Sequence, residues 1–404
     1  MTPAPVAARL EAGLDVAAFL FFPILVVAPR GLAPLAVAAG VVAAGLWAAS
    51  PSHAPAVAVG PGAAVLACLL AWGICSALWS ITPLRSLETA ARLAAMFAAG
   101  LALAGAAGSV AAPWRLLRCF LAGLCLGIAL TIADLATAGW VSAAFRHPYR
   151  ETRLNQASLA LAIVLLPAGA VLLRRRAGLA LLLAGIGAAT VYALAGTAAK
   201  TVLTAALPAA ALFYCWHRRA ARIAAVVSVL VIVTAPLTFA RLERLPALFE
   251  MADAFKYSAS HRLLIWSFAG DRIAEHPLLG WGLDASRAMP GGSDPIRAGQ
   301  TWLPLHPHNA PLQLWLELGA PGAVLFALLA AHFWWRLAER EWPRLFGAAA
   351  GASLVIALLG SFGTYGVWQE WWLGTLALSL FLVLVMARAD GLTPGRSPSG
   401  PGSG

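Results

Sequence analysis

Charged residues are scarce in this sequence of 404 residues: Asp, Glu, Lys and Arg make up 11%, whereas hydrophobic residues make up 61%. The mean hydropathy of +0.80 lies far above that of a soluble domain. So little charge excludes a soluble globular protein. The composition predicts an all-α polytopic membrane protein, in which each helix of about 20 apolar residues spans the bilayer.

Cysteine forms no pattern that would indicate a site. None of the five cysteines has metal-ligand or redox spacing, and all fall within apolar runs, so we expect them to be small buried residues. We expect no metal, no cofactor, no soluble domain and no internal repeat. No cleavable signal peptide is evident, and the first apolar run is expected to be a signal anchor. The cysteines are Cys68, Cys75, Cys119, Cys125 and Cys215.

Long apolar runs, in contrast, recur along the whole chain. They predict about twelve transmembrane helices in three parts: a bundle of nine spans over 1–240, a large periplasmic loop with short helices over 241–311, and three more spans over 312–388. The tail 389–404 is rich in Gly, Pro and Ser and is expected to be disordered. The runs lie near 13–29, 31–49, 62–80, 89–108, 116–138, 156–173, 177–196, 198–216, 222–240, 312–334, 346–366 and 371–387.

The short basic loops predict the orientation of these spans. With twelve spans they all fall on one side together with both termini, and the positive-inside rule makes that side cytoplasmic. The interval 241–311 then faces the periplasm. The net charge of +11 is divided between the two sides, so it does not indicate a nucleic-acid partner. The basic segments are Arg115/Arg118, Arg174–Arg176, Arg218/Arg219/Arg222, Arg336/Arg340/Arg344 and Arg388/Arg396.

Half of the 28 basic residues nevertheless fall on the expected outer side, where the rule makes them scarce. In the long loop, Asp and Glu equal the basic residues in number, so these charges can form solvated ion pairs. Lys200 has no acidic neighbour in the sequence, and it either binds an anion or extends to the membrane interface. The outer basic residues are Arg30, Arg85, Arg92, Arg146, Arg150, Arg153, Lys200, Arg241, Arg244, Lys256, Arg262, Arg272, Arg287 and Arg297.

One stretch places two of the eight histidines two residues apart, His306 and His308, just before an apolar helix that starts near Leu312. Pro307 and Pro311 restrict the backbone on both sides of His308. A histidine fixed at the membrane surface can accept a proton near neutral pH. We predict that His308 is a general base, against the alternatives of a helix cap or a bond to a loop carbonyl. His306 is expected to support it.

The segment from Ser258 to Glu275 has the apolar spacing of a helix, with Ser260 as its expected N-cap. Arg262 would then lie near a helix N-terminus, where a guanidinium binds phosphate well. The alternative is a surface ion pair with Asp271 or Glu275. A turn with Trp281 between two glycines follows, and this tryptophan either stacks on a sugar or lies in the interface.

An isolated cation and a base at a membrane surface fit transfer from a lipid-linked pyrophosphate. Cations such as Arg262 and Lys200 would stabilise the leaving pyrophosphate, and His308 would deprotonate the acceptor hydroxyl. The arginines of the loop 146–153, Arg146, Arg150 and Arg153, could bind the same donor or an anionic acceptor.

The residues around these positions resemble the bacterial O-antigen ligases and the related O-antigen polymerases. The resemblance lies in His308-Asn309 followed by Gly319 and Gly322, and in Arg262, Trp266 and the turn Pro-Leu-x-Gly-Trp-Gly before them. The family pattern has Ser-Arg-Gly where this chain has Thr-Ala-Ala-Lys, ending at Lys200. A lysine there lacks the bidentate fork of arginine.

The resemblance implies a bacterial inner-membrane glycosyltransferase that is independent of metal and acts on the periplasmic face. Its donor would be O-antigen linked to undecaprenyl pyrophosphate, and its acceptor a sugar hydroxyl of lipid A–core. The implied catalytic residues are His308 and Arg262. The expected substrate-binding residues are Lys200, Arg146, Arg150, Arg153, Asn309, His306 and Trp281.

Two other functions stay open. An O-antigen polymerase would use a second lipid-linked repeat unit as its acceptor. A transporter would be expected to show inverted repeats and ionisable residues at the midplane, whereas the charges here gather at span ends and in one loop.

Overall fold

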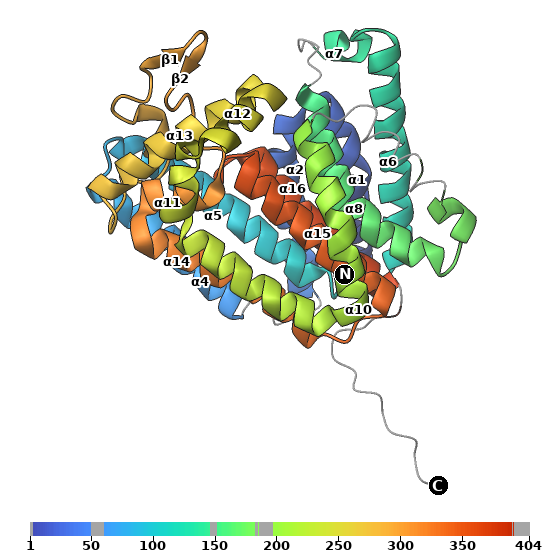
Figure 1. Cartoon of the computed structure of the whole chain (residues 1–404). Helices are drawn as coiled ribbons and strands as arrows, with labels where there is room; N and C mark the ends of the chain where they lie inside the picture. The colour runs from blue at the N-terminus through green and yellow to red at the C-terminus, as the bar shows by residue number, and fades with distance from the viewer. Residues whose placement is uncertain are drawn as a thin grey trace.

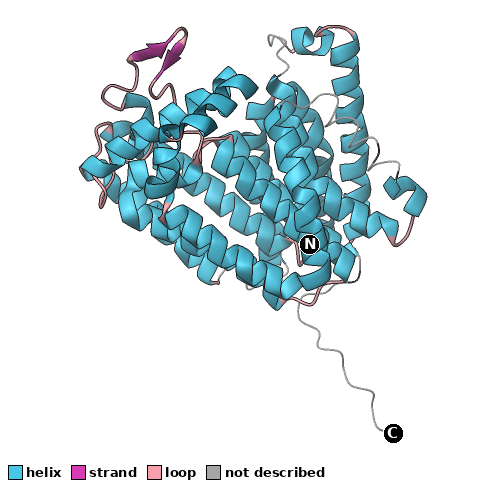
Figure 2. Ribbon diagram, in the orientation of Figure 1, coloured by secondary structure: helices cyan, strands magenta, loops and turns pink. Residues whose placement is uncertain are grey.

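The computed structural model describes residues 3–49, 60–145, 152–181, 185, 197–389 and 391. These residues are almost entirely helical, with one small antiparallel sheet of two strands (Figure 2). Prolines open several helices, where a missing N–H costs nothing. The long helices are α1 (Pro3–Val27), α2 (Leu32–Ala49), α4 (Pro61–Cys75), α5 (Pro83–Ala106), α6 (Pro113–Ala136), α8 (Thr152–Leu173), α10 (Thr197–Val233), α13 (Tyr257–Glu275), α14 (Ala310–Glu339), α15 (Arg344–Gly363) and α16 (Glu370–Ala389). The short elements are η1 (Pro29–Gly31), η3 (Ser76–Leu78), α7 (Trp140–Ala144), α11 (Ala235–Thr238), η4 (Phe239–Arg244), α12 (Pro246–Phe255), η5 (Ala285–Ala288), β1 (Pro295–Arg297) and β2 (Gln300–Thr301).

Within these described ranges, nine helices are long and apolar enough to cross a membrane, or ten if the bent pair Thr204–Val233 and Ala235–Arg244 forms one span. The predicted class, an all-α multi-pass membrane protein, is therefore confirmed. The number twelve stays a prediction, and the expected span 177–196 lies mostly outside the described residues.

The expected spans 198–216 and 222–240 are joined in the structure without a loop. The first span and residues 222–233 of the second form the two legs of α10, which meet at a kink where Trp216 has φ −137° and ψ 43°. The rest of the second span lies beyond a bend, in α11 and η4. No glycine or proline lies between 209 and 233, so nothing in the local sequence separates the legs by a loop. Both legs run alongside other long helices, and α10 packs against α14 and α15 (Figure 1).

Most of the long helices share one apolar core. The core joins α1, α2, α5, α6, α8 and α16, with large side chains that are fully buried. Four of the five cysteines lie on the outer surface of this bundle, so the expectation that they are buried is wrong. Thiols on the outside of a membrane bundle face apolar lipid, which small apolar residues tolerate. The core includes Leu14, Phe21, Leu46, Leu103, Phe120, Val164 and Trp372.

Several basic segments meet at one end of the molecule, where the N- and C-termini also lie (Figure 1). Arg115 bonds to Glu11 and Asp15 of α1, while Arg388 donates to the carbonyls of Ala107 and Val110. The ends of α1, α5, α6 and α16 are thus joined. Which side of the bilayer this end faces stays a prediction.

Residues 241–311 form a cap of short elements at the other end (Figure 1). The predicted helix over 258–275 is confirmed, because α13 runs from Tyr257 to Glu275. Ser260 is not its N-cap. The helix begins earlier, after Lys256, and the hydroxyl of the buried Ser260 donates to the carboxylate of Asp253 instead.

Candidate functional site

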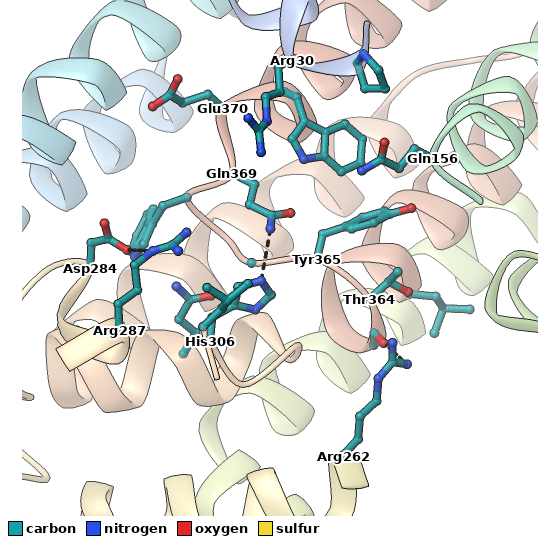
Figure 3. Close-up of a pocket in the computed structure, with 18 of the residues that line it drawn as sticks. Arg30, Gln156, Arg262, Asp284, Arg287, His306, Thr364, Tyr365, Gln369 and Glu370 are labelled. Carbon is teal, nitrogen blue, oxygen red and sulfur yellow. Dashed lines mark hydrogen bonds and ion pairs between the residues drawn. The ribbon is translucent and has the colours of Figure 1, made fainter. Parts of the chain in front are cut away.

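A large cavity lies between this cap and the helical bundle. Its volume is about 1510 Å³, and its lining comes from segments as distant in sequence as 28–30 and 363–371. Figure 3 shows that Arg30 and Arg262 enter it from opposite sides, with His306, Gln369 and Tyr365 between them. The basic residues of the lining are Arg30, Arg85, Arg92, Lys256, Arg262 and Arg287, and the acidic residues are Asp284 and Glu370.

The two histidines lie together, with ring centroids 4.2 Å apart: His306 lines the cavity, and His308 lies against it without being part of the lining. Nδ1 of His308 lies 2.9 Å from the carbonyl oxygen of Thr364. A carbonyl only accepts, so this nitrogen carries the proton and Nε2 of His308 has a free lone pair. No hydrogen bond in the described part of the chain occupies that Nε2. His308 therefore has the tautomer of a general base.

His306 has the opposite arrangement. Its Nδ1 accepts from the backbone N–H of His308 at 3.1 Å, so the proton is on Nε2. That Nε2 lies 3.1 Å from the side-chain amide of Gln369. The Oε1 of Gln369 has no other partner, and turning the amide lets it accept this proton. Both nitrogens of His306 are then occupied, so it lines the cavity as a support rather than as the base.

The backbone at His308 is strained. Its φ of 54° is in the left-handed region, which costs a non-glycine residue roughly 1–2 kcal/mol. The bonds to His306 and Thr364 hold it there, and Trp266 of α13 donates to the carbonyl of Pro307 at 2.9 Å. Strain that surrounding contacts maintain is a common property of functional sites.

Burial keeps both imidazoles neutral. Desolvation, followed by the charges of His308, Arg287 and Arg262, lowers the pKa of His306 to about 3. Desolvation, and then Arg262 and His261 against the opposing bond to Thr364, lowers the pKa of His308 to about 4. At neutral pH the lone pair on Nε2 of His308 is thus available to a substrate.

Arg262 carries an uncompensated charge beside these rings. It rises from α13 into the cavity, and its only hydrogen bond among the described residues goes to the carbonyl of Gly363 at 2.7 Å (Figure 3). The alternative ion pair with Asp271 or Glu275 does not form, and Glu275 pairs with Arg272 instead. Burial lowers the pKa of Arg262 from its ordinary value. A guanidinium still stays charged at neutral pH, so its free N–H groups suit an anion.

Tyr365 lies across the cavity wall from Arg262. Its ring packs edge-on against Trp371 at 4.6 Å, and its buried hydroxyl has no partner within the described ranges. Burial raises the pKa of this phenol, so it stays protonated and can donate. Sequence reading missed Tyr365 and Gln369, because neither is part of a recognised motif.

A broken helix holds the motif segments together. At Gly319 of α14 the backbone leaves the helix, with φ 62° and ψ −160°, a conformation open essentially to glycine alone. The freed backbone binds the turn 277–282: Trp281 and Gly282 donate to the carbonyls of Leu316 and Glu317. A Cβ on Gly319 would lie 2.3 Å from the carbonyl oxygen of Leu278. The absence of a side chain at Gly319 thus lets this turn come close to α14.

Glu317 ties three lining segments to this break. It is fully buried, and its carboxylate accepts from the backbone of Asp284, from Ser286, from Trp368 and from Gln313. Gln313 in turn accepts from the N–H of Val367. A buried carboxylate with four donors is satisfied and acts as a rigid connector.

The structure places other predicted site residues as follows. Asn309 is fully buried and caps α14, its Oδ1 accepting from Leu312 N at 3.0 Å. Trp281 packs edge-on against His276 and donates to the carbonyl of Arg272. Neither lines the cavity, so a substrate contact for either stays a prediction.

Lys200 lies in the first turn of α10, whose Val202 and Ala205 line the cavity although Lys200 itself does not. Arg153 opens α8, and only its backbone is described. Arg146 and Arg150 lie outside the described residues. Roles for these four in substrate binding stay predictions.

Four further arginines of the lining were not predicted as site residues. Arg30, Arg85 and Arg92 come from the first third of the chain, and Arg287 comes from η5. The available signal was their position on the outer side, against the positive-inside rule.

The fold and the cavity define a multi-pass membrane protein with two neutral histidines beside guanidinium groups that have no carboxylate partner among the described residues. Residues 161–327, which include Arg262, His308 and both motif glycines, match the family model described as O-Antigen ligase. The predicted resemblance to O-antigen ligases is thereby confirmed for this part of the chain.

Three relatives from Rickettsia agree with this similarity. Proteins of Rickettsia conorii, Rickettsia felis and Rickettsia bellii, each named "Putative polysaccharide ligase", are 35%, 33% and 35% identical to this chain over 137 residues. The aligned part spans about a third of this chain and about a third of each relative, 33% in each case.

Proposed function

We propose that this protein is an O-antigen ligase, which moves O-antigen polysaccharide from undecaprenyl pyrophosphate to a sugar hydroxyl of lipid A–core. The observation that carries the proposal is a free Nε2 on His308, whose ring lies against the cavity-lining His306, near an unpaired Arg262 that also lines the cavity. A base and a cation are the two groups that this transfer requires.

In the reaction, Nε2 of His308 takes the proton of the acceptor hydroxyl. The acceptor oxygen bonds to the anomeric carbon as the bond from that carbon to the pyrophosphate oxygen breaks. Arg262 stabilises the negative charge that grows on the leaving pyrophosphate. The bond to Thr364 steadies the imidazolium that forms on His308.

Other residues support the donor in this proposal. Tyr365 donates its free hydroxyl to the pyrophosphate or to a sugar oxygen near Arg262. We assign Lys200, in the first turn of α10, to the same lipid-linked phosphate. The site would face the periplasm from the bacterial inner membrane, with both termini in the cytoplasm, as the loop charges predict.

The testing experiment mixes purified protein in nanodiscs with undecaprenyl-pyrophosphate glycan and lipid A–core in the presence of EDTA. We expect glycan on the core with the wild type and none with His308→Ala. Lengthened lipid-linked glycan on an untouched core would make the protein a polymerase. No glycan transfer by folded wild-type protein would refute both enzyme assignments, and a loss of transfer with EDTA alone would refute metal independence.

A further inference from the structure

The arginines that break the positive-inside rule near the N-terminus gather at a single place. Arg30 follows α1, and Arg85 and Arg92 lie on α5, yet all three line the cavity. In Figure 3, Arg30 lies away from Arg262, as do Asp284 and Glu370, the carboxylates that pair with Arg85 and Arg92. Topology alone disfavours basic residues at outer span ends. Their convergence on one wall therefore requires a different reason.

The charges on this wall are only partly compensated. Arg85 pairs with Asp284 at 2.9 Å, and Arg287 lies 3.6 Å from the same carboxylate. Arg92 pairs with Glu370 at 3.1 Å. Three guanidinium groups thus share two carboxylates, and the fourth, Arg30, has no side-chain hydrogen bond or ion pair in the described part of the chain.

This wall is separate from Arg262. In Figure 3, Arg30 and Glu370 lie on one side of Gln369, with Arg287 and Asp284 to the side of His306, while Arg262 rises from the opposite direction. One pyrophosphate held at Arg262 would leave the second wall unoccupied.

We propose that Arg30, Arg92 and Arg287 form a second anion site, which binds a phosphoryl group carried by the acceptor glycolipid. The assignment to the acceptor rests on the proposed glycosyl transfer. A cavity with a cationic wall on each side of a neutral base can hold two anionic substrates apart and bring an acceptor hydroxyl between them. Exposed pairs such as Arg92 with Glu370 can open to admit a ligand at little cost.

The test measures binding in the absence of donor, so it does not depend on glycosyl transfer. Protein in zwitterionic nanodiscs is titrated with lipid A–core and with the same glycolipid after phosphatase treatment. The variants are Arg30→Gln and, as a matched control on the same outer end, Arg241→Gln. Arg241 is exposed and does not line the cavity.

We expect wild type and Arg241→Gln to prefer the phosphorylated glycolipid about tenfold, the worth of one charge-assisted hydrogen bond, and Arg30→Gln to lose that preference. Equal binding of both glycolipids by the wild type would overturn the proposal, as would a preference retained in Arg30→Gln. The titration is repeated in nanodiscs with phosphatidylglycerol. If phosphatidylglycerol displaces both glycolipids equally from the wild type but not from Arg30→Gln, the site binds a bilayer headgroup and the acceptor assignment is wrong.

Discussion

Two arginines at opposite ends of this molecule have opposite surroundings. Arg115, at the start of α6, bonds to two nearly buried carboxylates of α1, Glu11 and Asp15. At the cavity, the guanidinium of Arg262 bonds, among the described residues, only to the carbonyl of Gly363. A guanidinium whose bonds are complete joins helices, and one with open donors is prepared for an anion. The partner, not the residue type, distinguishes structure from function here.

The histidines sharpen this comparison most. His308 and His217 each bond a backbone carbonyl, at 2.9 and 2.8 Å, but only His308 lies beside the cavity. We expect His308→Ala to lower kcat by about 10²–10⁴-fold, since it removes the base. His217→Ala should leave kcat within a few fold, as measured in the reconstituted glycan-transfer assay on folded protein. A similar loss in both variants would mean that His308 acts through stability alone.

We expect variants of Arg262 and Arg115 to differ in activity in the same assay. Arg262→Gln should lower kcat/KM by about 10²–10³-fold, because the leaving pyrophosphate loses its cation. Arg115→Gln should leave kcat/KM nearly intact but lower the melting temperature in nanodiscs, since it strands two acids. An Arg262→Gln protein that is unstable but fully active when folded would contradict the distinction between the two ends.

Tyr365 tests whether an unpartnered donor at the cavity has a function. Tyr365→Phe removes only the hydroxyl, and we expect kcat/KM to fall by about three- to tenfold, the worth of one hydrogen bond. The control is Tyr214→Phe, at an exposed position on α10. If Tyr365→Phe raises the melting temperature and leaves the activity unchanged, the hydroxyl is a buried group without a hydrogen-bond partner and has no role in activity.

The pH dependence of kcat/KM is the prediction with the smallest expected effect at neutral pH. His308 acts in its neutral form, and burial lowers its pKa to about 4. The value of kcat/KM should thus be flat near neutrality and fall as the pH drops through about 4. The positive charge of Arg262 contributes to this lowering, so in Arg262→Gln the fall should begin at higher pH. A profile that does not move would place Arg262 away from the base.

Stability should follow the same linkage. Because the folded pKa values of His306 and His308 lie below the ordinary 6.5, protonation favours the unfolded state. The stability that the two neutral histidines contribute is fully present above pH 6.5. It is lost as the pH falls toward the folded pKa values, about 4 for His308 and about 3 for His306.

The sequence by itself determined the class of protein, most of the spans and the helix of Arg262, and it singled out His308, whose role stays a prediction. Hydropathy and motif spacing are local properties, and a bilayer forces long apolar runs into helices. The sequence also showed that Arg30, Arg85 and Arg92 fall on the expected outer side, against the positive-inside rule, but it did not show the reason.

Only the tertiary structure decided which nitrogen of His308 is free, which arginines have partners, and that Gly319 opens α14 to the turn 277–282. These properties depend on contacts between residues that lie far apart in the chain, such as Arg262 and Gly363 or Arg85 and Asp284. Ser260 shows the same limit. Serine is a common N-cap residue, but the helix begins earlier, after Lys256, and the hydroxyl of Ser260 donates to Asp253 instead. A local pattern specifies an element, whereas the charge and hydrogen bonding of a site depend on what other elements bring to it.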